Sequence, residues 1–307
     1  MGDPSGIGPE VTLKTLASPG ISGLADFLVI GDRFVLDRVG RRLGIKLKIP
    51  LLDLKNVPQS DFRYGEERPA FGSSAMQYLD KALELIKAGE ADCLITGPVN
   101  KSAIREAGFS AFQGHTEYLA EKTDTKEYAM MFVGDKLKVT LVTRHVALKD
   151  VGRSLSSAAI YRTICITHKY LRRYFGIRKP RIGVAGLNPH AGEKGAFGSE
   201  ELRVIIPAIK RASDALGGVT GPFPPDAIFH SAFTGTFDAV IAMYHDQGLI
   251  PFKLLYFMDG VNLTLGLPFV RTSPDHGTAF EIAGRGVADP RSMIAAVKLA
   301  CRLRAKR

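Results

Sequence analysis

Residues 239–245 read Ala-Val-Ile-Ala-Met-Tyr-His, a short apolar run that ends in a histidine. The same pattern recurs at residues 139–145 (Val-Thr-Leu-Val-Thr-Arg-His) and 182–190 (Ile-Gly-Val-Ala-Gly-Leu-Asn-Pro-His). Apolar runs bounded by turn residues are typical of buried parallel strands. Because open α/β sheets bind ligands at the carboxyl ends of such strands, we expect an α/β fold with polar groups gathered at that edge.

The histidines that end these runs are His145, His190 and His245. Three imidazoles delivered to one sheet edge can bind a single divalent metal and leave one coordination position open for a substrate. The alternative is that each ring caps its own strand or hydrogen-bonds a loop. Because the pattern occurs three times, it favours the metal site, and neutral imidazoles suit Zn²⁺, Co²⁺ or Ni²⁺.

Helical and strand patterns alternate along the rest of the chain. Residues 128–133 and 138–142 alternate in polarity around Gly134-Asp135, which predicts a β-hairpin with a type I′ turn and therefore a mixed sheet. The Gly- and Pro-rich residues 217–225 are expected to form a rigid surface connection. Further strands are expected at residues 26–30 and 92–96, and helices at residues 11–17, 32–43, 72–88, 157–175, 200–216 and 290–304.

Length and composition indicate a globular enzyme. The 307 residues suffice for one large or two medium domains, and 45% of them are hydrophobic and 23% charged. No stretch has the length of a membrane span or the pattern of a signal peptide. Because the three cysteines lie far apart in the sequence, we expect a reducing compartment and a cytoplasmic protein.

The formal net charge of +10 could indicate nucleic-acid binding. However, Lys and Arg are scattered, and the sequence has no zinc-finger spacing, aromatic RNA-binding signature or basic tail. An excess of cations also raises the local concentration of a small anionic substrate. We therefore expect a small anion as the partner, with a basic nucleic-acid module as the alternative.

Two segments could bind an anion at the start of a helix. The first is Gly2-Asp-Pro-Ser-Gly-Ile-Gly-Pro-Glu10, although an ordinary structural turn is an equal alternative. A strand normally precedes such a turn, and no strand pattern precedes this one. The second is Gly114-His-Thr-Glu117, where His115 and Thr116 could donate to phosphate or carboxylate oxygens. Here the alternative is an ordinary helix cap.

Polar residues near the histidine segments suggest further roles. Lys253 lies in an apolar run and could act as a general acid/base or bind substrate, or it could belong to an edge strand. Asn262 and Arg271 flank a compact apolar segment and suit recognition of phosphate or carboxylate. Glu193 and Asp246 could orient the neighbouring imidazoles.

Six blocks occur in this order: GDPSGIGPE (2–10), GHTEYLAE (114–121), TRHVAL (143–148), NPHAGE (188–193), MYHDQGL (243–249) and VNLTLGLPFVRTSPDHGTAFEIAGRG (261–286). Together they resemble the 4-hydroxythreonine-4-phosphate dehydrogenase family of pyridoxal phosphate biosynthesis. The resemblance runs from Gly2 to about Ser292. The last block is also similar to the adenine-side loop of isocitrate and isopropylmalate dehydrogenases, which share the superfamily fold.

The resemblance implies roles for individual residues. It implies metal binding by His145, His190 and His245, and catalytic roles for Lys253 and Asp226. The implied substrate-binding residues are His115, Thr116, Lys253, Asn262 and Arg271. The loop of residues 275–286 would bind the nicotinamide cofactor through Asp275, His276, Gly277, Thr278 and Gly284.

The resemblance also implies an architecture and a reaction. It implies two α/β domains with a cleft between them, residues 1–110 with 267–307 on the nucleotide side and residues 111–266 on the metal and dimer side. The active site would lie at a homodimer interface. NAD or NADP would take a hydride from C3 of 4-phosphooxy-L-threonine, and the β-keto acid would lose CO₂. Among metals Zn²⁺ is favoured, with Co²⁺ or Mg²⁺ as alternatives.

Two departures from the family pattern bear on these expectations. The strand before the first glycine turn is missing, and Lys194 adds a cation to the loop after His190. Related dehydrogenases act on threonate or erythronate phosphates or on aromatic cis-dihydrodiols, so these substrates are alternatives. A zinc hydrolase that uses the same histidines is a more remote one, and an acyltransferase that acts on acetyl phosphate is more remote still.

Overall fold

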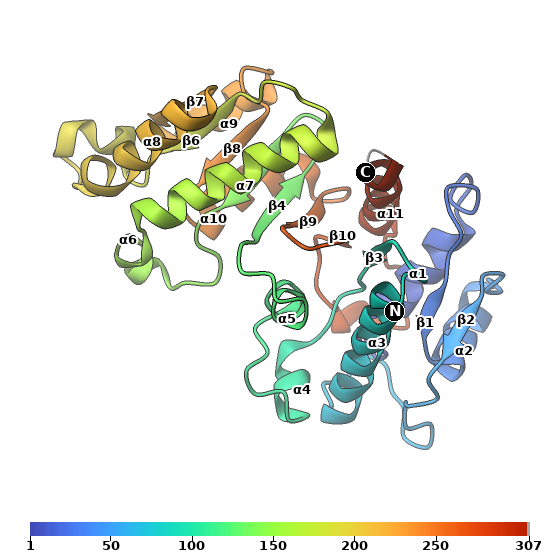
Figure 1. Cartoon of the computed structure of the whole chain (residues 1–307). Helices are drawn as coiled ribbons and strands as arrows, with labels where there is room; N and C mark the ends of the chain where they lie inside the picture. The colour runs from blue at the N-terminus through green and yellow to red at the C-terminus, as the bar shows by residue number, and fades with distance from the viewer. Residues whose placement is uncertain (306–307) are drawn as a thin grey trace. The chain divides into compact units, whose positions relative to one another are not determined.

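Parallel strand pairs organise the first of the two units into which the chain divides (Figure 1). The computed structural model describes residues 1–305. The first unit comprises Met1–Asp124 and Phe269–Ala305, and the second comprises Thr125–Pro268. In the first unit β1 (Val29–Gly31) pairs with β2 (Leu51–Asp53), and β3 (Cys93–Ile95) pairs with β10 (Val270–Pro274).

Helices cover these strands. Asp32 caps α2 by accepting from the Phe34 N–H at 2.9 Å, and Gly44 ends this helix in the left-handed conformation. Helix α11 packs against β10 and β3. The helices expected at residues 32–43, 72–88 and 290–304 are confirmed, with ends shifted by a few residues. The full set is α1 (Gly8–Ala17), α2 (Arg33–Leu43), α3 (Pro69–Lys87), α4 (Lys101–Glu106), α5 (His115–Lys122) and α11 (Arg291–Ala305), with the 3₁₀ turn η4 (Phe280–Ile282).

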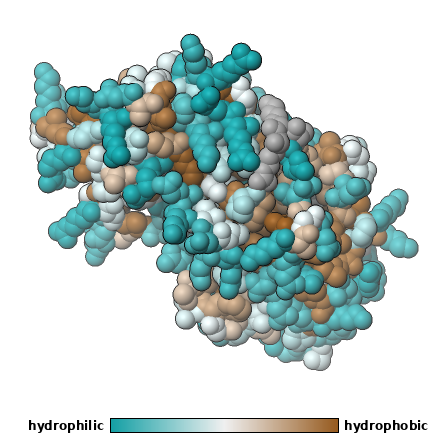
Figure 2. Space-filling view, viewed as in Figure 1, coloured by the Kyte–Doolittle hydropathy of each residue, from teal (hydrophilic) through white to brown (hydrophobic). Residues whose placement is uncertain are grey.

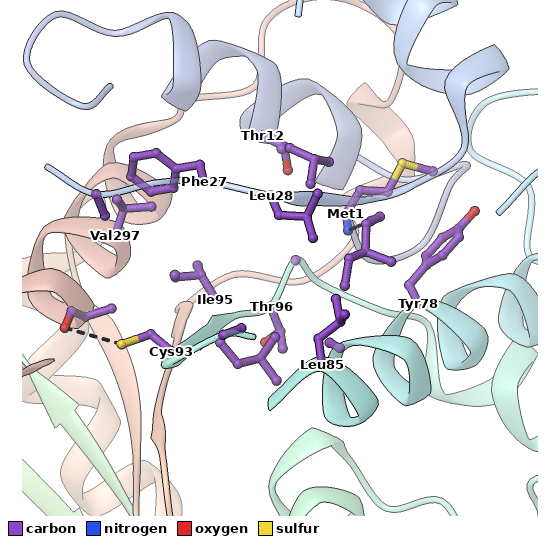
Figure 3. Close-up of a pocket in the computed structure, with 18 of the residues that line it drawn as sticks. Met1, Thr12, Phe27, Leu28, Tyr78, Leu85, Cys93, Ile95, Thr96 and Val297 are labelled. Carbon is purple, nitrogen blue, oxygen red and sulfur yellow. Dashed lines mark hydrogen bonds between the residues drawn. The ribbon is translucent and has the colours of Figure 1, made fainter. Parts of the chain in front are cut away.

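A cavity of about 520 Å³ lies inside the first unit (Figure 3). Its wall is mainly apolar and includes Leu28 before β1, Leu85 of α3, Ile95 of β3 and Val297 of α11. An apolar wall gives the oxygens of a phosphorylated ligand few hydrogen-bond partners. The cavity is mostly apolar, but its lining also includes Thr96 and His115, and His115 is one of the residues predicted to bind the anion.

The second unit contains a mixed sheet with the strand order β9-β4-β5-β8-β6-β7. Strand β4 is antiparallel to both β5 and β9, whereas β5, β8, β6 and β7 are parallel neighbours. The predicted hairpin and the mixed sheet are thus confirmed. The strands are β4 (Ala129–Val133), β5 (Lys138–Leu141), β6 (Ile182–Ala185), β7 (Val219–Phe223), β8 (Ala239–Ala242) and β9 (Val261–Leu265).

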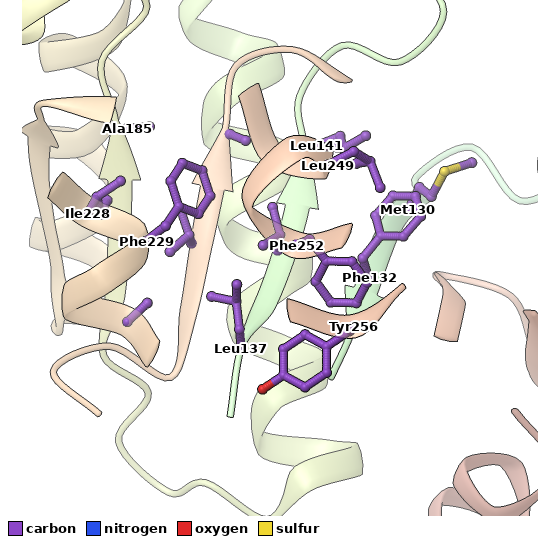
Figure 4. Close-up of a cluster of buried hydrophobic side chains, with 14 residues drawn as sticks. Met130, Phe132, Leu137, Leu141, Ala185, Ile228, Phe229, Leu249, Phe252 and Tyr256 are labelled. Carbon is purple, nitrogen blue, oxygen red and sulfur yellow. The ribbon is translucent and has the colours of Figure 1, made fainter. Parts of the chain in front are cut away.

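The core of the second unit lies between this sheet and helices α9 and α10 (Figure 4). Phe252 of α10 is fully buried, and its ring centroid lies 5.7 Å from that of Phe132 and 5.3 Å from that of Tyr256. Every residue of β6 and β8 is buried, which explains why these strands read as continuous apolar runs. Strand β4 is also buried throughout, so the alternation in polarity expected for residues 128–133 does not correspond to one exposed face. The helical elements are η1 (Leu148–Asp150), α6 (Val151–Ser154), α7 (Ser157–Phe175), η2 (Pro189–Gly195), the π-helical η3 (Glu201–Ile205), α8 (Ile206–Leu216), α9 (Pro225–Phe233) and α10 (His245–Tyr256).

Two sequence predictions for this unit are wrong. The hairpin does not use a type I′ turn, because neither Gly134 nor Asp135 has positive φ. Gly134 is instead required by packing, since a Cβ there would lie 2.5 Å from the Tyr256 ring. Residues 217–225 are not merely a surface connection: they contain β7, where Pro222 is tolerated because β7 is the last strand of the order.

The length and hydropathy of the helices bear on whether any of them could cross a membrane. Within residues 1–305, no helix combines the length and the apolar character that crossing a bilayer requires.

Candidate active site

The three histidine segments follow three neighbouring parallel strands. Strand β8 pairs with β5 on one side and with β6 on the other. His145 follows β5, His190 lies in the turn after β6, and His245 follows β8 as the first residue of α10. Because parallel neighbours end at the same sheet edge, the fold delivers all three histidines to that edge, as the sequence predicts.

Two of the three imidazoles lie close together. The ring centroids of His145 and His245 are 6.0 Å apart with an interplanar angle of 35°. Two imidazoles on one ion, each with a metal–nitrogen bond of about 2 Å, place their centroids roughly 5 to 6 Å apart. Nδ1 of His245 lies 2.7 Å from Oδ1 of Asp246, which leaves Nε2 as the ring atom suited to a metal.

His190 is not part of this pair. Its ring packs against Phe197, with centroids 6.1 Å apart, and its backbone lies in a left-handed turn. Within residues 1–305, no group of three or more His, Cys, Asp or Glu side chains is arranged to hold a metal ion. The structure therefore brings together two of the three predicted ligands, and the third follows the adjacent strand.

Side-chain hydrogen bonds connect the ends of these three strands. Thr143 Oγ1 donates to the carbonyl of Met243 at 2.7 Å, which joins the segments after β5 and β8. Gln247 Oε1 accepts from the Met243 N–H, and its Nε2 donates to the carbonyl of Gly186, both at 2.7 Å. Gln247 thus joins the segments after β8 and β6. Sequence reasoning missed it, although a glutamine two residues after His245 was the available signal.

The other predicted residues of the second unit lie on separate elements. Lys253 is half-buried on α10, so the edge-strand alternative for it is wrong. Asp226 is exposed in the first turn of α9, a helix that contacts η2, which carries His190. Asn262 is half-buried in β9. The catalytic and substrate-binding roles of these residues remain predictions.

Two cationic side chains, those of Arg271 and Lys101, lie near His115 in the first unit. Arg271 is 2% exposed in β10 and donates from NH2 to Thr96 Oγ1 at 2.7 Å. Burial lowers its pKa to about 10, although Glu117 acts to raise it. Burial also lowers the pKa of Lys101. Desolvated cations of this kind interact strongly with an anion that enters their site.

His115 belongs to the same group. Burial lowers its pKa well below the usual value, and the positive charges of Arg271 and Lys101 lower it further. A neutral imidazole donates one hydrogen bond without adding charge. Thr116, also predicted from sequence, is buried in the first turn of α5.

Sequence reasoning missed Thr96 and Lys101 in this group. Both follow β3, which is the parallel neighbour of the strand that carries Arg271. A polar residue after a short apolar run was the available signal, the same pattern that drew attention to the histidines.

The glycine-rich turn of residues 2–8 has a structural role. The Ile7 N–H donates to the carbonyl of Thr278 at 2.9 Å, and a Cβ on Gly6 would lie 3.0 Å from that carbonyl oxygen. The backbone of this turn thus approaches the predicted cofactor loop closely. The structural-turn alternative is the better interpretation, and the suggested anion cradle is not supported.

A buried ion pair fixes the end of the predicted cofactor loop. Glu10 accepts from the N–H groups of Ala288 at 2.7 Å and Gly286 at 3.2 Å. Lys14 donates to the carbonyls of the same two residues at 2.7 and 2.9 Å and pairs with Glu10 at 2.8 Å. The loop is therefore held by α1 at its end, and at its start the Asp275 N–H donates to Ser292 Oγ at 3.0 Å.

Comparisons with known proteins agree with one another. The family model described as "Pyridoxal phosphate biosynthetic protein PdxA" matches residues 25–300. The chain is 47% identical to a 4-hydroxythreonine-4-phosphate dehydrogenase of Desulfosudis oleivorans, over 98% of this chain and 93% of that protein. It is 44% identical to a D-threonate 4-phosphate dehydrogenase of Salmonella typhimurium, over 99% and 97%. Among solved structures, a 4-hydroxythreonine-4-phosphate dehydrogenase from Klebsiella pneumoniae aligns with a TM-score of 0.88 at 41% identity, over 99% and 96% of the two chains.

The lowered pKa of His115 predicts a dependence of stability on pH. A histidine in the unfolded chain takes up a proton below about pH 6.5, whereas folded His115 stays neutral to lower pH. The contribution of His115 is therefore fully present above about pH 6.5 and is lost as the pH falls, by up to about 1.4 kcal/mol per pH unit. Urea unfolding of the His115→Gln variant should show a shallower loss of stability between about pH 6.5 and 5 than the wild-type protein. Identical slopes would contradict the assignment.

Proposed function

Because the chain belongs to the PdxA family of pyridoxal phosphate biosynthetic proteins, we propose that it oxidises 4-phosphooxy-L-threonine with NAD or NADP. The chain is an oxidoreductase. The product, 2-amino-3-oxo-4-phosphooxybutanoate, would lose CO₂ to give 3-amino-2-oxopropyl phosphate. The observation that carries the substrate class is the buried Arg271 with its neighbours His115 and Lys101, because such a group favours a compact anion such as a phosphate.

Residues of the first unit would bind the anionic ends of the substrate. The planar guanidinium of Arg271 suits two parallel hydrogen bonds to a phosphate or carboxylate. Neutral His115 would add one donor, and Thr116 a hydroxyl, without the cost of burying a further charge. In the second unit, Asn262 and Lys253 are the proposed substrate contacts.

The proposed metal ligands are His145, His190 and His245. The first and third already have the ring separation that a shared ion requires, and Asp246 orients the ring of His245. Zn²⁺ is the favoured ion, with Co²⁺ or Mg²⁺ as alternatives. When bound, the metal would polarise the C3 hydroxyl and later the ketone, and the nicotinamide would accept the hydride.

Residues of this chain would transfer the proton and bind the cofactor. Lys253 and Asp226 are proposed to take up and return the proton of the reacting hydroxyl, since amine and carboxyl side chains are among the groups that serve as general acids and bases. Asp275, His276, Gly277, Thr278 and Gly284 are proposed to bind NAD or NADP. The bonds from Glu10 and Lys14 to residues 286 and 288 support a pre-formed loop, which lowers the entropy cost of binding the cofactor.

A second substrate is supported by the comparisons. A relative named for D-threonate 4-phosphate is 44% identical to this chain, close to the 47% of a relative named for 4-hydroxythreonine-4-phosphate. D-Threonate 4-phosphate carries a hydroxyl where 4-phosphooxy-threonine carries an amine, so the anion contacts described above fit both. D-Erythronate 4-phosphate, an aromatic cis-dihydrodiol and hydrolysis at the metal are further alternatives.

The chain is also proposed to form a homodimer. Helix α10 and its C-cap residue Phe257 expose an apolar stripe: Ile250, Leu254 and Phe257 are 69, 84 and 72% exposed and are spaced along one helix face. An exposed apolar stripe of this kind is typical of a protein–protein interface. Because the stripe is on the helix that begins at His245, dimerisation would bring a second copy to the helix that carries a proposed metal ligand.

The dimer is tested by the Leu254→Asp variant. We expect sedimentation of the wild-type protein to give about twice the 33.3 kDa mass of one chain, and the variant to shift toward one chain because a carboxylate would be buried without a partner. Val287→Asp is the matched control, since Val287 is 64% exposed and belongs to the first unit, whereas α10 belongs to the second. A wild-type monomer, or a Leu254→Asp dimer as stable as the wild type, would contradict the proposal.

The reaction is tested by NADH and NADPH formation from a panel of phosphorylated hydroxy acids. With 4-phosphooxy-L-threonine we expect turnover that a chelator abolishes and that added Zn²⁺ or Co²⁺ restores. A higher kcat/KM with D-threonate 4-phosphate than with 4-phosphooxy-L-threonine would identify D-threonate 4-phosphate as the preferred substrate. Metal-dependent hydrolysis without any need for a nicotinamide would overturn the dehydrogenase proposal.

The anion contact is tested by steady-state kinetics of Arg271→Ala. We expect KM for the phosphorylated substrate to rise roughly 10- to 100-fold, because a hydrogen-bonded charge on the phosphate or carboxylate is lost. Arg302→Ala, which removes an exposed arginine from α11, should leave KM unchanged. An unchanged KM in a folded Arg271→Ala protein would place the anion contact elsewhere.

A further inference from the structure

The carboxylate of Glu201 is buried beneath the segment that carries His190. Its side chain is 2% exposed at the start of the π-helical turn η3. The N–H groups of Leu187 and Asn188 both donate to Oε1 at 2.8 Å, and Nδ2 of Asn188 donates to Oε2 at 2.9 Å. A buried carboxylate thus receives its described hydrogen bonds from the two residues that precede Pro189 and His190.

The turn that these bonds anchor has an unfavourable backbone. Residues 190–195 all have φ between 40° and 102°, and His190, Ala191, Glu193 and Lys194 among them are not glycine. Left-handed conformations cost free energy for residues with a Cβ, so a run of them persists only where the surroundings enforce it. Such strain is often found at functional sites.

Two glycines make room for the carboxylate. A Cβ on Gly192 would lie 2.6 Å from Oε2 of Glu201, and a Cβ on Gly186 would lie 3.2 Å from Oε1 and 2.8 Å from the Cα of Ala191. The turn therefore closes over Glu201 at two points, before and after His190. Gly186 also accepts the hydrogen bond from Gln247, so the same segment is joined to the strand end that leads to His245.

We propose that Glu201 is a positioning residue that holds the His190 turn at the sheet edge, where the imidazole can join His145 and His245 on a metal. This inference rests on the proposed function in taking His190 as a metal ligand. Glu201 itself would not touch the metal or the substrate. Its Oε1 accepts from both backbone amides between β6 and the turn, while Oε2 accepts from the side chain of Asn188. The negative charge strengthens all three bonds relative to those of a neutral side chain.

Replacing Glu201 by glutamine tests whether the carboxylate positions the His190 turn or only fills space beneath it. Glu201→Gln keeps the size of the side chain but replaces one of two acceptor oxygens by an NH₂ group, which would face an N–H donor. Glu200→Gln is the matched control: it makes the same change one residue earlier. The backbone amides that bond the Glu200 carboxylate are its own and that of Ser199, and its described partner in the His190 segment is the side-chain Nδ2 of Asn188 at 3.0 Å. Glu201→Asp is a milder second variant, which keeps the charge but draws it back from the amides.

The first readout is hydrogen exchange of the full-length protein without metal. In Glu201→Gln we expect the amides of Leu187 and Asn188 to exchange about 10-fold faster, because a neutral amide oxygen replaces the charged acceptor that both N–H groups share, and the new NH₂ group faces Nδ2 of Asn188. Glu201→Asp should give a smaller increase, and Glu200→Gln less than about a twofold change at these two amides. Unchanged exchange in both Glu201 variants would overturn the inference.

The second readout is binding of Co²⁺ alone, followed by its visible absorption. We expect the Kd for Co²⁺ to rise roughly 10- to 100-fold in Glu201→Gln, the range found when a group that orients a metal ligand is removed. Glu200→Gln should bind Co²⁺ within about twofold of the wild type. A Glu201→Gln protein that melts at lower temperature yet binds Co²⁺ as the wild type does would show a merely structural role and overturn the inference.

The His190→Ala variant distinguishes failure of this inference from failure of the proposed function. If His190→Ala weakens Co²⁺ binding but neither Glu201 variant does, His190 is a ligand and only the positioning role is wrong. If His190→Ala binds Co²⁺ as tightly as the wild type, the proposed ligand role of His190 fails, and the positioning role toward the metal fails with it.

Discussion

The parallel pairing of β8 with both β5 and β6 is the constraint on which the chemistry of the second unit depends. It ends three strands at one edge, and each is followed by a histidine. The pairing alone leaves the segments after the strands free to diverge. Thr143 and Gln247 limit this freedom, because they join the segments after β5, β8 and β6 by hydrogen bonds of 2.7 Å. The separation of the His145 and His245 rings follows from this bonding.

In the first unit the main constraint is the desolvation of a buried positive charge, that of Arg271. A guanidinium that is 2% exposed has lost most of its hydration, and Thr96 returns a neutral hydrogen bond. Burial lowers the pKa values of Arg271 and Lys101, and that of His115 as well, so the charged forms gain from an anion at this place. Desolvation of these groups costs free energy, and an anion bound beside them would offset part of that cost.

Local pattern was sufficient to predict many of the helices and strands and the strand ends that the three histidines follow, but not the contacts between distant residues. The runs before His145, His190 and His245 are buried on both faces and read clearly as strands. Strand β7 was missed because an edge strand with Gly and Pro resembles a loop, and the hairpin turn type was wrong because Gly134 serves Tyr256, a residue far along the chain. Gln247, Lys101 and Glu201 escaped notice for the same reason, since their partners become neighbours only in the folded chain.

The central claim is that one cation is shared by imidazoles from three adjacent strand ends. A crystal structure of the protein grown with Co²⁺, with anomalous scattering recorded at the cobalt edge, tests it most directly. We expect a single strong anomalous peak that marks one cobalt ion bonded to His145, His190 and His245, at about 2 Å from a ring nitrogen of each. A peak bonded to other residues, or well-ordered rings at this edge with the cobalt bound elsewhere, would contradict it.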